Sequence, residues 1–337
     1  MEVKFLKAGS GDSIIIHHKI YNIVIDGGND SKYLLSEIDN IYKNNEVINL
    51  LVITHHDDDH IKGIIDLLNH VSESKYDINR PFIEKVIFNS PRLILGKLPK
   101  DDNNLLSYRQ AHIVEELLQK INTNWTQYTD QSKPIVFEDL IINILSPAVE
   151  DLKEYSLQKG AYLTSDWKCD WKIPMWRLEP YITDKSQDKS ISNKSSIVFQ
   201  ISCDNKKLLL TGDVTPGRLQ TILDQLSAEN GGLPVQYDIV KLPHHGSYRS
   251  LNKSILEKLK CNTFIISTNG KKYFLPNKRA LLKVAKYSKR INGGAANFFF
   301  NYEETLNNIE IHTKEKIDYN FIVTPNNENY GIHFRYS

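Results

Sequence analysis

Cysteine is scarce in this chain of 337 residues. The three cysteines, Cys169, Cys203 and Cys261, lie far apart and form no Cys-x-x-Cys pair. An odd number of widely spaced cysteines argues against a disulfide framework, and the missing pair argues against a thiolate zinc site. We expect the cysteines to be reduced and structural.

The chain also lacks an excess of charge of either sign. Lysine and arginine total 42, aspartate and glutamate total 41, and the formal net charge is +1. This balance gives no global electrostatic basis for binding nucleic acid or a membrane surface. Any such partner must be recognised locally.

Long apolar runs are missing as well. The opening Met1–Gly9 does not contain the apolar core of roughly 7 to 15 residues that a signal peptide needs, and no run approaches the roughly 20 residues that span a bilayer. We expect a cytoplasmic protein with no membrane contact. A hydrophobic content of 40% can fill a sizeable core, and we expect residues 1–337 to form a single domain.

Strand and helix patterns alternate along the chain, without a repeat of fixed period. Three short strands separated by glycines predict an antiparallel meander at the start: Val3–Leu6, Ser13–His17 and Tyr21–Ile25. Apolar residues at helical spacing predict helices over Ile61–Val71, Leu105–Ile121, Pro216–Leu226, Ser254–Leu259 and Lys278–Tyr287. Further strands are predicted over Ile48–Ile53, Lys85–Asn89, Pro134–Phe137, Leu140–Leu145, Ser196–Ser202, Lys207–Leu210, Tyr237–Lys241, Thr263–Ser267, Ile309–His312 and Tyr319–Val323. This mixture favours a layered sandwich of the α/β or α+β class.

Residues 150–194 interrupt this pattern and are predicted to be an inserted loop. They interleave aromatic residues with cations: Trp167, Lys168, Trp171, Lys172, Trp176 and Arg177. Such a segment can stack the bases of a single-stranded nucleic acid and meet its phosphates. Alternatively, the tryptophans pin a long loop onto the core, or the loop is a lid or a docking surface for a protein partner.

The densest chemical signal is the run His55–His60, which reads His-His-Asp-Asp-Asp-His and follows the buried strand Ile48–Ile53. Imidazole and carboxylate together suit divalent zinc, manganese or iron. Adjacent aspartates repel one another unless a cation or several donors compensate them, which disfavours the alternative of a solvated turn. The run therefore predicts a metal site between a strand and a helix.

Two later strands end in similar residues. Leu208–Leu210 leads through Thr211 and Gly212 to Asp213, and Ile239–Lys241 leads to the pair His244 and His245. Taken singly, an aspartate after a strand is more often a cap, and a histidine pair is often a hydrogen-bonded turn. Three such strand ends on one chain favour one shared site.

These motifs together resemble the metallo-β-lactamase superfamily, and within it the hydrolase domains of DNA-uptake competence proteins. The matching segments follow the expected order over about residues 1–285: Gly11-Asp12-Ser13, Asp26-Gly27-Gly28, Thr54–His60 with Gly63, Asn193–Val198, Thr211-Gly212-Asp213 and Pro243–Ser247. The resemblance implies an α/β fold, a four-layer αβ/βα sandwich of two mixed sheets flanked by helices. It also implies one or two divalent ions at the strand ends along one edge.

The resemblance carries roles onto individual residues. The implied metal ligands are His55, Asp57, Asp59, His60, Asp213 and His244. Asp59 would also orient the attacking water, and His245 would contact the ligand or leaving group, although the roles of His244 and His245 can be exchanged. Lys241 and Ser247 would contact a phosphate or oxyanion, with a solvated lysine and a turn cap as alternatives. Asp26 is expected to anchor the ligand loops rather than to bind metal.

Two departures from the superfamily pattern bear on the metal. The second position of the common His-x-His-x-Asp-His motif is Asp57, which makes the site more anionic and shifts the expected ion from Zn²⁺ towards Mn²⁺ or Mg²⁺. Ser146 stands where many relatives place another histidine ligand, and Leu275 precedes Pro276 where relatives often show His-Pro. His56 and Asp58 occupy variable positions and are expected to lie outside the ligand set.

The expected function is metal-dependent hydrolysis. A divalent ion lowers the pKa of water from about 15.7 towards about 7, which supplies hydroxide at neutral pH. The primary hypothesis is a phosphodiesterase or nuclease that acts on single-stranded nucleic acid or a nucleotide-like substrate, with possible protein partners in a multi-component system. The alternatives are a hydrolase of carboxylic esters, lactones or phosphocholine-type esters, and a binding or regulatory module with a depleted metal site.

Overall fold

The structure is a computed structural model that describes residues 1–73, 80–95, 106–156, 169–183 and 185–336. Seven strands form a first sheet in the order β17-β1-β2-β3-β4-β5-β6. Their bounds are β1 Glu2–Leu6, β2 Ile14–His18, β3 Tyr21–Ile25, β4 Ile48–Ile53, β5 Val86–Phe88, β6 Trp125–Thr126 and β17 Gly331–Arg335. Strands β1 to β3 pair antiparallel, which confirms the predicted meander, and β3 to β6 pair parallel.

Eight strands form a second sheet in the order β16-β15-β14-β12-β10-β9-β8-β7. Their bounds are β7 Ile135–Phe137, β8 Leu140–Ser146, β9 Val198–Cys203, β10 Lys206–Leu210, β12 Ile239–Lys241, β14 Thr263–Ile266, β15 Ala296–Phe300 and β16 Phe321–Thr324. Strands β10 to β16 run parallel, whereas β7, β8 and β9 pair antiparallel. A small third sheet pairs β11 Val235–Gln236 with β13 Leu259–Lys260.

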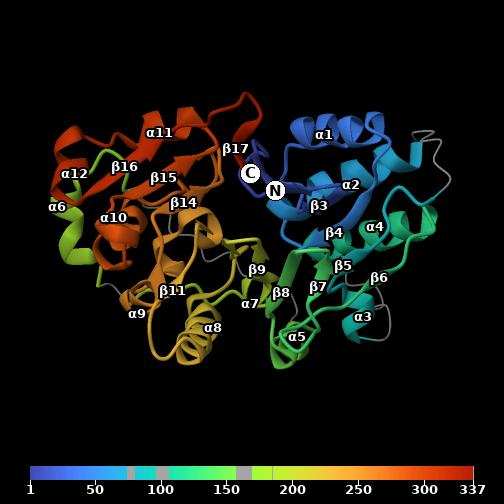
Figure 1. Cartoon of the computed structure of the whole chain (residues 1–337), viewed down its shortest axis with the longest axis horizontal. Coiled ribbons are helices and arrows are strands. Elements are labelled where there is room, and N and C mark those ends of the chain that lie inside the picture. Colours follow the sequence, from blue (N-terminus) through green and yellow to red (C-terminus); the bar gives the residue numbers. More distant parts are fainter. Residues whose placement is uncertain (74–79, 96–105, 157–168, 184, 337) are drawn as a thin grey trace.

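Helices cover the outer faces of both large sheets. They are α1 Lys32–Lys43, α2 Asp58–Glu73, α3 Pro91–Leu95, α4 Leu106–Lys120, α5 Val149–Ser156, α6 Met175–Leu178, α7 Ile191–Lys194, α8 Pro216–Glu229, α9 Lys253–Glu257, α10 Lys278–Tyr287, α11 Glu303–Ile309 and α12 Thr313–Asp318. Four 3₁₀ turns complete the described elements: η1 Glu179–Tyr181, η2 Pro243–Gly246, η3 Tyr248–Ser250 and η4 Ile291–Gly293. Figure 1 shows α1, α2 and α4 on the right, α10, α11 and α12 on the left, and the strands between them.

Three apolar cores explain this layering. One core fills the space between the sheets, where Phe5 of β1 and Phe199 of β9 belong to the same cluster. A second joins the first sheet to α1, α2 and α4, and a third joins the second sheet to α8, α9 and α10. All six residues of β4 are buried, as expected for a parallel strand covered on both faces. The predicted α/β class and the four-layer αβ/βα order are therefore confirmed.

One element predicted from the sequence was wrong, and several elements of the structure had not been predicted. The segment Ile309–His312, predicted as a strand, ends helix α11 and connects it to α12. Ile309 is buried under that helix and Glu310 adopts a left-handed conformation with φ 52°, so the alternating apolar residues mark a helix end. The strands β15 and β17 and the helix α1 were not predicted.

The predicted insertion contains short helices where the structure describes it. Helix α5 lies at its start, and α6, η1 and α7 lie between residues 169 and 194. Trp171 is partly buried and its Nε1 donates to the carbonyl oxygen of Pro276 at 2.7 Å, so this tryptophan pins the segment. Trp176 is 63% exposed with the Arg177 guanidinium over its ring. Trp167 and Lys168 lie outside the described residues, and a stacking surface stays a prediction.

Candidate metal centre

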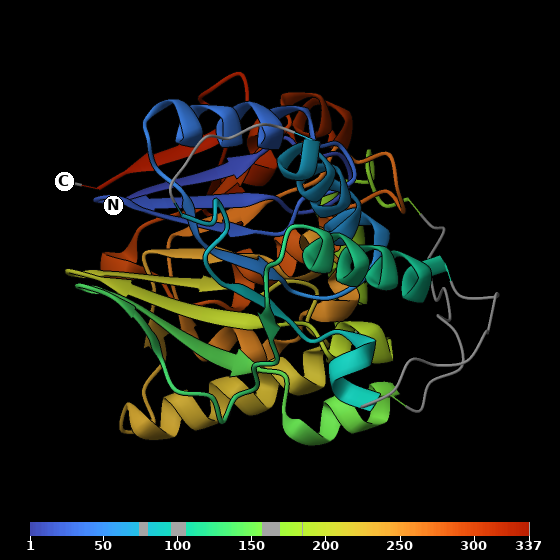
Figure 2. The same ribbon diagram turned by 90° about the vertical axis from the view of Figure 1, so that its right-hand side faces the viewer.

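The predicted site residues come together where strands of the two sheets end. Asp26 follows β3, the run His55–His60 follows β4, Asp213 follows β10, and the histidine pair of η2 follows β12. The backbone N–H of Ile197, before β9, donates to the carbonyl oxygen of Thr54 at 3.0 Å and joins the sheets at this edge. Figure 2 shows the strands side by side, with both chain termini beyond one end of them, on the left.

Close backbone contacts fix the start of helix α2. A Cβ atom on Gly63 would lie 2.0 Å from the carbonyl oxygen of Gly27, and one on Gly11 would lie 1.6 Å from that of Asp59. Only glycine permits such approaches. The loops after β1 and β3 therefore press directly on the turn of helix that carries Asp59 and His60.

Each imidazole at this edge has its Nδ1 atom bound to a fixed acceptor. The His60 Nδ1–H donates to Asp26 Oδ2 at 2.7 Å, and the His245 Nδ1–H donates to the Ser267 carbonyl oxygen at 2.9 Å. The Thr54 hydroxyl donates to Asp26, so its oxygen accepts from the His55 Nδ1–H at 3.1 Å. These partners direct each Nε2 towards the centre, where it offers a lone pair to a metal ion once any proton on it is displaced. Asp26 thus anchors the ligand loops, as expected.

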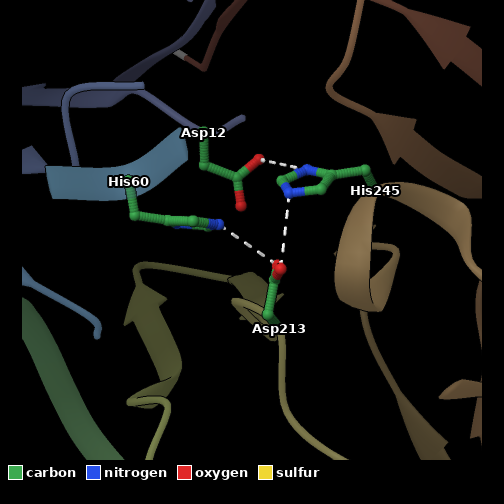
Figure 3. A group of neighbouring side chains, drawn as sticks. All are labelled: Asp12, His60, Asp213 and His245. Carbon is green, nitrogen blue, oxygen red and sulfur yellow. Dashed lines mark ion pairs between the residues drawn. The ribbon is translucent and has the colours of Figure 1, made fainter. Parts of the chain in front are cut away.

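The four side chains in Figure 3 define what we call the candidate centre: Asp12, His60, Asp213 and His245. Each offers an atom within 4.8 Å of the others, and all four are buried. Asp213 Oδ1 lies 3.4 Å from His60 Nε2, and its Oδ2 lies 3.4 Å from His245 Nε2. Asp12 Oδ1 lies 3.6 Å from His245 Nδ1. Asp213 is therefore shared between two imidazoles.

The candidate centre contains buried polar atoms whose hydrogen-bonding capacity is unused. Among the described residues, no hydrogen-bond partner exists for Nε2 of His55, His60 and His245, or for Oδ1 of Asp12 and Asp213. Buried lone pairs without donors are costly, yet these converge on one region. Imidazole nitrogen and carboxylate oxygen are ligands of divalent zinc, manganese and iron, so the residues fit a metal ion.

Charge balance in the centre comes from histidine and one lysine. Burial opposes ionisation of Asp213, but the charges of His245, His60 and His244 keep its pKa well below its ordinary value. Burial likewise lowers the pKa of His60, and Asp213 and Asp26 overcome this and raise it well above the ordinary value. Protons on imidazole therefore occupy the place of a cation in the metal-free protein.

Lys241, predicted to contact substrate, is fully buried beneath the centre. Its ammonium lies 2.5 Å from Asp12 Oδ2, donates to the Gly212 carbonyl oxygen at 3.0 Å and lies 3.7 Å from Asp213 Oδ1. Burial opposes ionisation of Asp12, while the charge of Lys241 lowers its pKa. This geometry supports a positioning role for Lys241, which holds two carboxylates in place.

His244 and His245 differ in their surroundings. Both adopt left-handed backbone conformations, with φ 47° and 52°, and such strain is concentrated at functional sites. His245 belongs to the candidate centre, and its Nε2 also lies 3.8 Å from Asp59 Oδ2. The His244 Nδ1–H donates to Asp188 at 3.0 Å, and its Nε2 lies 3.9 Å from Asp213. The arrangement supports His245 as a ligand at least as well as His244.

The remaining residues of the run His55–His60 have separate contacts. Asp57 Oδ2 lies 3.7 Å from His55 Nε2, and its Oδ1 accepts from the Ser192 hydroxyl at 2.7 Å. Asp58 is exposed and accepts from Gln110, away from the centre. His56 is buried, and this burial lowers its pKa to about 4. Asp57 thus lies beside the His55 imidazole, whereas Asp58 contacts Gln110 instead.

Ser247 and Ser146 complete the set of sequence-based candidates. The Ser247 side chain accepts from the Arg249 backbone N–H and caps the turn η3. Ser146, which stands where many members of the superfamily were expected to carry a histidine ligand, is buried and offers only a hydroxyl. No described contact joins either hydroxyl to the candidate centre, so a role of Ser247 towards an oxyanion stays a prediction.

Sequence reasoning missed two residues of this region. Asp12 was noticed only as part of a motif, although it faces His245 and Lys241. Lys272 was not considered, and its ammonium lies 3.6 Å from Asp59 Oδ2 with 36% of its side chain exposed. Burial lowers the pKa of Lys272, but Asp59 and nearby groups raise it above the ordinary value. Lys272 therefore brings a permanent positive charge to the rim of the centre.

Comparison with known proteins supports the resemblance. No family model matches the chain. ComE operon protein 3 of Bacillus subtilis (strain 168) is 21% identical over 309 residues, which span 86% of this chain and 31% of that protein. The chain therefore matches less than a third of the length of this relative.

Solved structures with the metallo-β-lactamase fold are similar to the chain. YhfI from Bacillus subtilis is 10% identical with a TM-score of 0.46, over 99% of this chain and 98% of that chain. Zn²⁺-bound PqqB from Methylobacterium extorquens is 10% identical with a TM-score of 0.48, over 100% of both chains. No helix in the described part of the chain is long and apolar enough to cross a bilayer.

Proposed function

We propose that the chain is a metal-dependent hydrolase that cleaves phosphodiester bonds in nucleic acid or a nucleotide-like substrate. The observation that carries this proposal is the convergence of unpartnered Nε2 atoms from His55, His60 and His245 on the buried carboxylate of Asp213. A site of this kind needs a cation to complete it.

Two groups of residues would bind divalent ions. Asp59, His60 and His245 form one group, and His55 and Asp57 form the other, with Asp213 between them. His244, whose Nε2 lies 3.9 Å from Asp213 Oδ2, would add a further imidazole beside that shared carboxylate. A bound ion would lower the pKa of water and neutralise developing charge on a phosphate. The ligand set mixes imidazole nitrogen, which suits zinc, with carboxylate oxygen, which suits manganese, so both ions are candidates.

The chain's own residues contribute orientation and charge. Asp26 and the Ser267 carbonyl oxygen set the tautomers of His60 and His245, so both imidazoles present lone pairs. Asp59 would orient a water as an ionised carboxylate, since His60, His245 and Lys272 lower its pKa despite its burial. The orientation of the two imidazoles and the charge of Asp59 thus depend on neighbouring groups that would not themselves touch the substrate.

Lys272 favours a phosphate substrate over a neutral ester. A phosphodiester carries a negative charge that an ammonium at the rim can meet, whereas a carboxylic ester carries none. The exposed Trp176 and Arg177 offer a further surface for a base and a phosphate. We therefore place hydrolysis of carboxylic esters and lactones second. A phosphocholine-type ester also carries a phosphate charge, and the exposed Trp176 and Arg177 are what favour nucleic acid over it.

The test compares substrates on protein loaded with manganese or zinc. Bis-p-nitrophenyl phosphate, single-stranded DNA and RNA, and a carboxylic ester are each incubated with the protein and with the Asp213→Asn variant. We expect phosphodiester cleavage that needs metal and is lost in the variant. Turnover of the carboxylic ester alone would support the second candidate. A protein that takes up no divalent metal would support a binding module and refute both hydrolases.

A further inference from the structure

A second group of metal-binding side chains lies at the opposite end of the sheets. His18 precedes the turn between β2 and β3, Asp139 lies in the turn between β7 and β8, and Cys203 precedes the turn between β9 and β10. These strands lead away from their turns towards the candidate centre, so the turns lie at the far edge. We call His18, Asp139 and Cys203 the hairpin cluster.

The cluster joins the two sheets. His18 belongs to the first sheet, and Asp139 and Cys203 belong to hairpins of the second. His18 and Cys203 are 5% and 1% exposed, so the imidazole and thiol are withdrawn from solvent, while Asp139 is exposed. A thiol, an imidazole and a carboxylate are thus held together by tertiary packing alone.

The distances from the Cys203 sulfur match a metal site. Its Sγ lies 3.6 Å from His18 Nδ1 and 3.7 Å from Asp139 Oδ2, and Asp204 Oδ2 lies at 3.9 Å. In a tetrahedral zinc site, with Zn–S near 2.3 Å and Zn–N or Zn–O near 2.1 Å, a ligand nitrogen or oxygen lies roughly 3.5 Å from the sulfur. The donor atoms of His18, Asp139 and Cys203 all lie within 4.8 Å of one another, so small adjustments bring these three to a common ion. Asp204 lies beside the sulfur and would turn towards the ion to add a fourth ligand.

A cavity gives access to this group. It has a volume of about 510 Å³ and is lined by Met1, Cys203, Asp204, Asn205, Lys206 and Tyr336. Two of the four donor residues, Cys203 and Asp204, therefore border a space from which an ion can enter.

We propose that His18, Asp139, Cys203 and Asp204 bind a zinc ion that fastens the hairpins of the two sheets together. Thiolate and imidazole ligands favour zinc over magnesium or calcium, and four protein ligands make a closed structural site. Binding releases the thiol proton and replaces the present contacts, in which the His18 imidazole and the Lys19 ammonium both meet Asp139. The bonds formed are those from the ion to one sulfur, one nitrogen and two oxygens.

The alternative is a hydrogen-bonded cluster that binds no metal. In it the His18 Nε2 pairs with Asp139 Oδ1 at 2.9 Å, and the thiol stays protonated. Burial and the charges of Asp139 and Asp204 raise the pKa of the Cys203 thiol to about 11, which suits either a resting thiol or a thiolate that forms only on a cation.

Cobalt(II) separates these possibilities because its thiolate complexes have a strong charge-transfer absorption. The candidate centre offers no sulfur, so the band reports the hairpin cluster. We expect the band on adding Co²⁺ to the full chain, its displacement by Zn²⁺, and its loss in Cys203→Ser. Asp139→Asn, an exposed substitution that leaves the core unchanged, should weaken it. The matched controls Cys169→Ser and Cys261→Ser should retain it.

Absence of the band, or its persistence in Cys203→Ser, would overturn the proposal. The band should remain in Asp59→Ala, which removes a proposed ligand only from the other end, so failure of the hydrolase proposal is distinguishable. Zinc should also raise the thermal midpoint of Asp59→Ala and not that of Asp59→Ala combined with Cys203→Ser. An equal rise in both would contradict a zinc ion that fastens the sheets through Cys203.

Discussion

Histidine and aspartate side chains gather at both ends of the sandwich, but they have unused hydrogen-bonding atoms at one end and are paired with one another at the other. At the candidate centre, outer partners bind Nδ1 of each imidazole and leave Nε2 without a hydrogen bond. At the hairpin cluster, His18 and Lys19 already satisfy Asp139, so the ligands pair with one another. Preorganisation therefore distinguishes the ends more than composition does, and a metal should bind more tightly at the candidate centre.

Removing Asp59, the carboxylate 3.8 Å from His245 of the candidate centre, tests the largest difference. Asp59→Ala should lower phosphodiester turnover by at least about 100-fold, because loss of a ligand exceeds the cost of losing an outer partner. Asp58→Ala is the matched control, since Asp58 is adjacent but bonds Gln110. Steady-state kinetics with bis-p-nitrophenyl phosphate and circular dichroism check activity and fold. Equal losses in both variants would mean that the centre is placed wrongly.

Removing preorganisation, with every ligand kept, tests the comparison directly. Asp26→Asn removes the negative charge and one of the two oxygens that accept from Thr54 and from the His60 Nδ1–H, so the tautomer of the imidazole is no longer fixed. Metal affinity should fall by about 10- to 100-fold, as for other partners of ligating histidines. Asp66→Asn is the control, because Asp66 lies on the same helix but bonds Ser31. Isothermal titration measures both, and an unchanged affinity in Asp26→Asn would show that the two ends do not differ in this way.

The pH dependence of metal binding should also differ between the ends. A metal displaces protons from its ligands, so affinity rises with pH by about tenfold per unit for each proton until the ligand's own pKa is passed. Burial lowers the pKa of His244, but Asp213 and Asp188 raise it to about 9, and burial raises that of Cys203 to about 11. The contribution of His244, which lies beside the candidate centre, should therefore end near pH 9, while thiolate binding at the hairpin cluster keeps rising towards pH 11. Titrations with Co²⁺ from pH 7 to 10 measure both, and parallel curves would contradict the distinction.

The smallest effect is expected from the rim charge. Lys272→Met should raise the KM for a phosphodiester about 10-fold, since a hydrogen bond to a charged group contributes about 1.5 kcal/mol or more. Turnover of a neutral carboxylic ester should not change. Lys271→Met supplies a neighbouring lysine as control. If both substrates are affected equally, Lys272 maintains the loop and does not bind phosphate.

Local patterns predicted much of the fold and the site. The strands that lead into His55–His60, Asp213 and the histidine pair were recognised because each is a short apolar run that ends in polar residues. Asp12 was matched as part of a motif but not as a site residue, because its partner Lys241 lies far along the chain and meets it only across two sheets. Lys272 precedes two residues with left-handed backbones, Tyr273 and Phe274, and follows no periodic pattern.

The hairpin cluster was invisible for a related reason. The spacing of the cysteines argued against a thiolate zinc site, and this argument is sound only for ligands that are close in sequence. His18, Asp139 and Cys203 come from three hairpins, and the register of two different sheets brings them together. Proximity of this kind arises from sheet packing and leaves no periodic pattern in the sequence.

The contact between Gly27 and Gly63 determines how this protein can vary. The turn that carries Asp59 and His60 is positioned by backbone against backbone, with no room for even a methyl group. The apolar residues of α2, such as Ile64 and Leu67, can then exchange for others of similar volume without moving the ligands. Gly27 and Gly63 thus allow the surrounding core residues to be substituted, while they themselves tolerate no substitution.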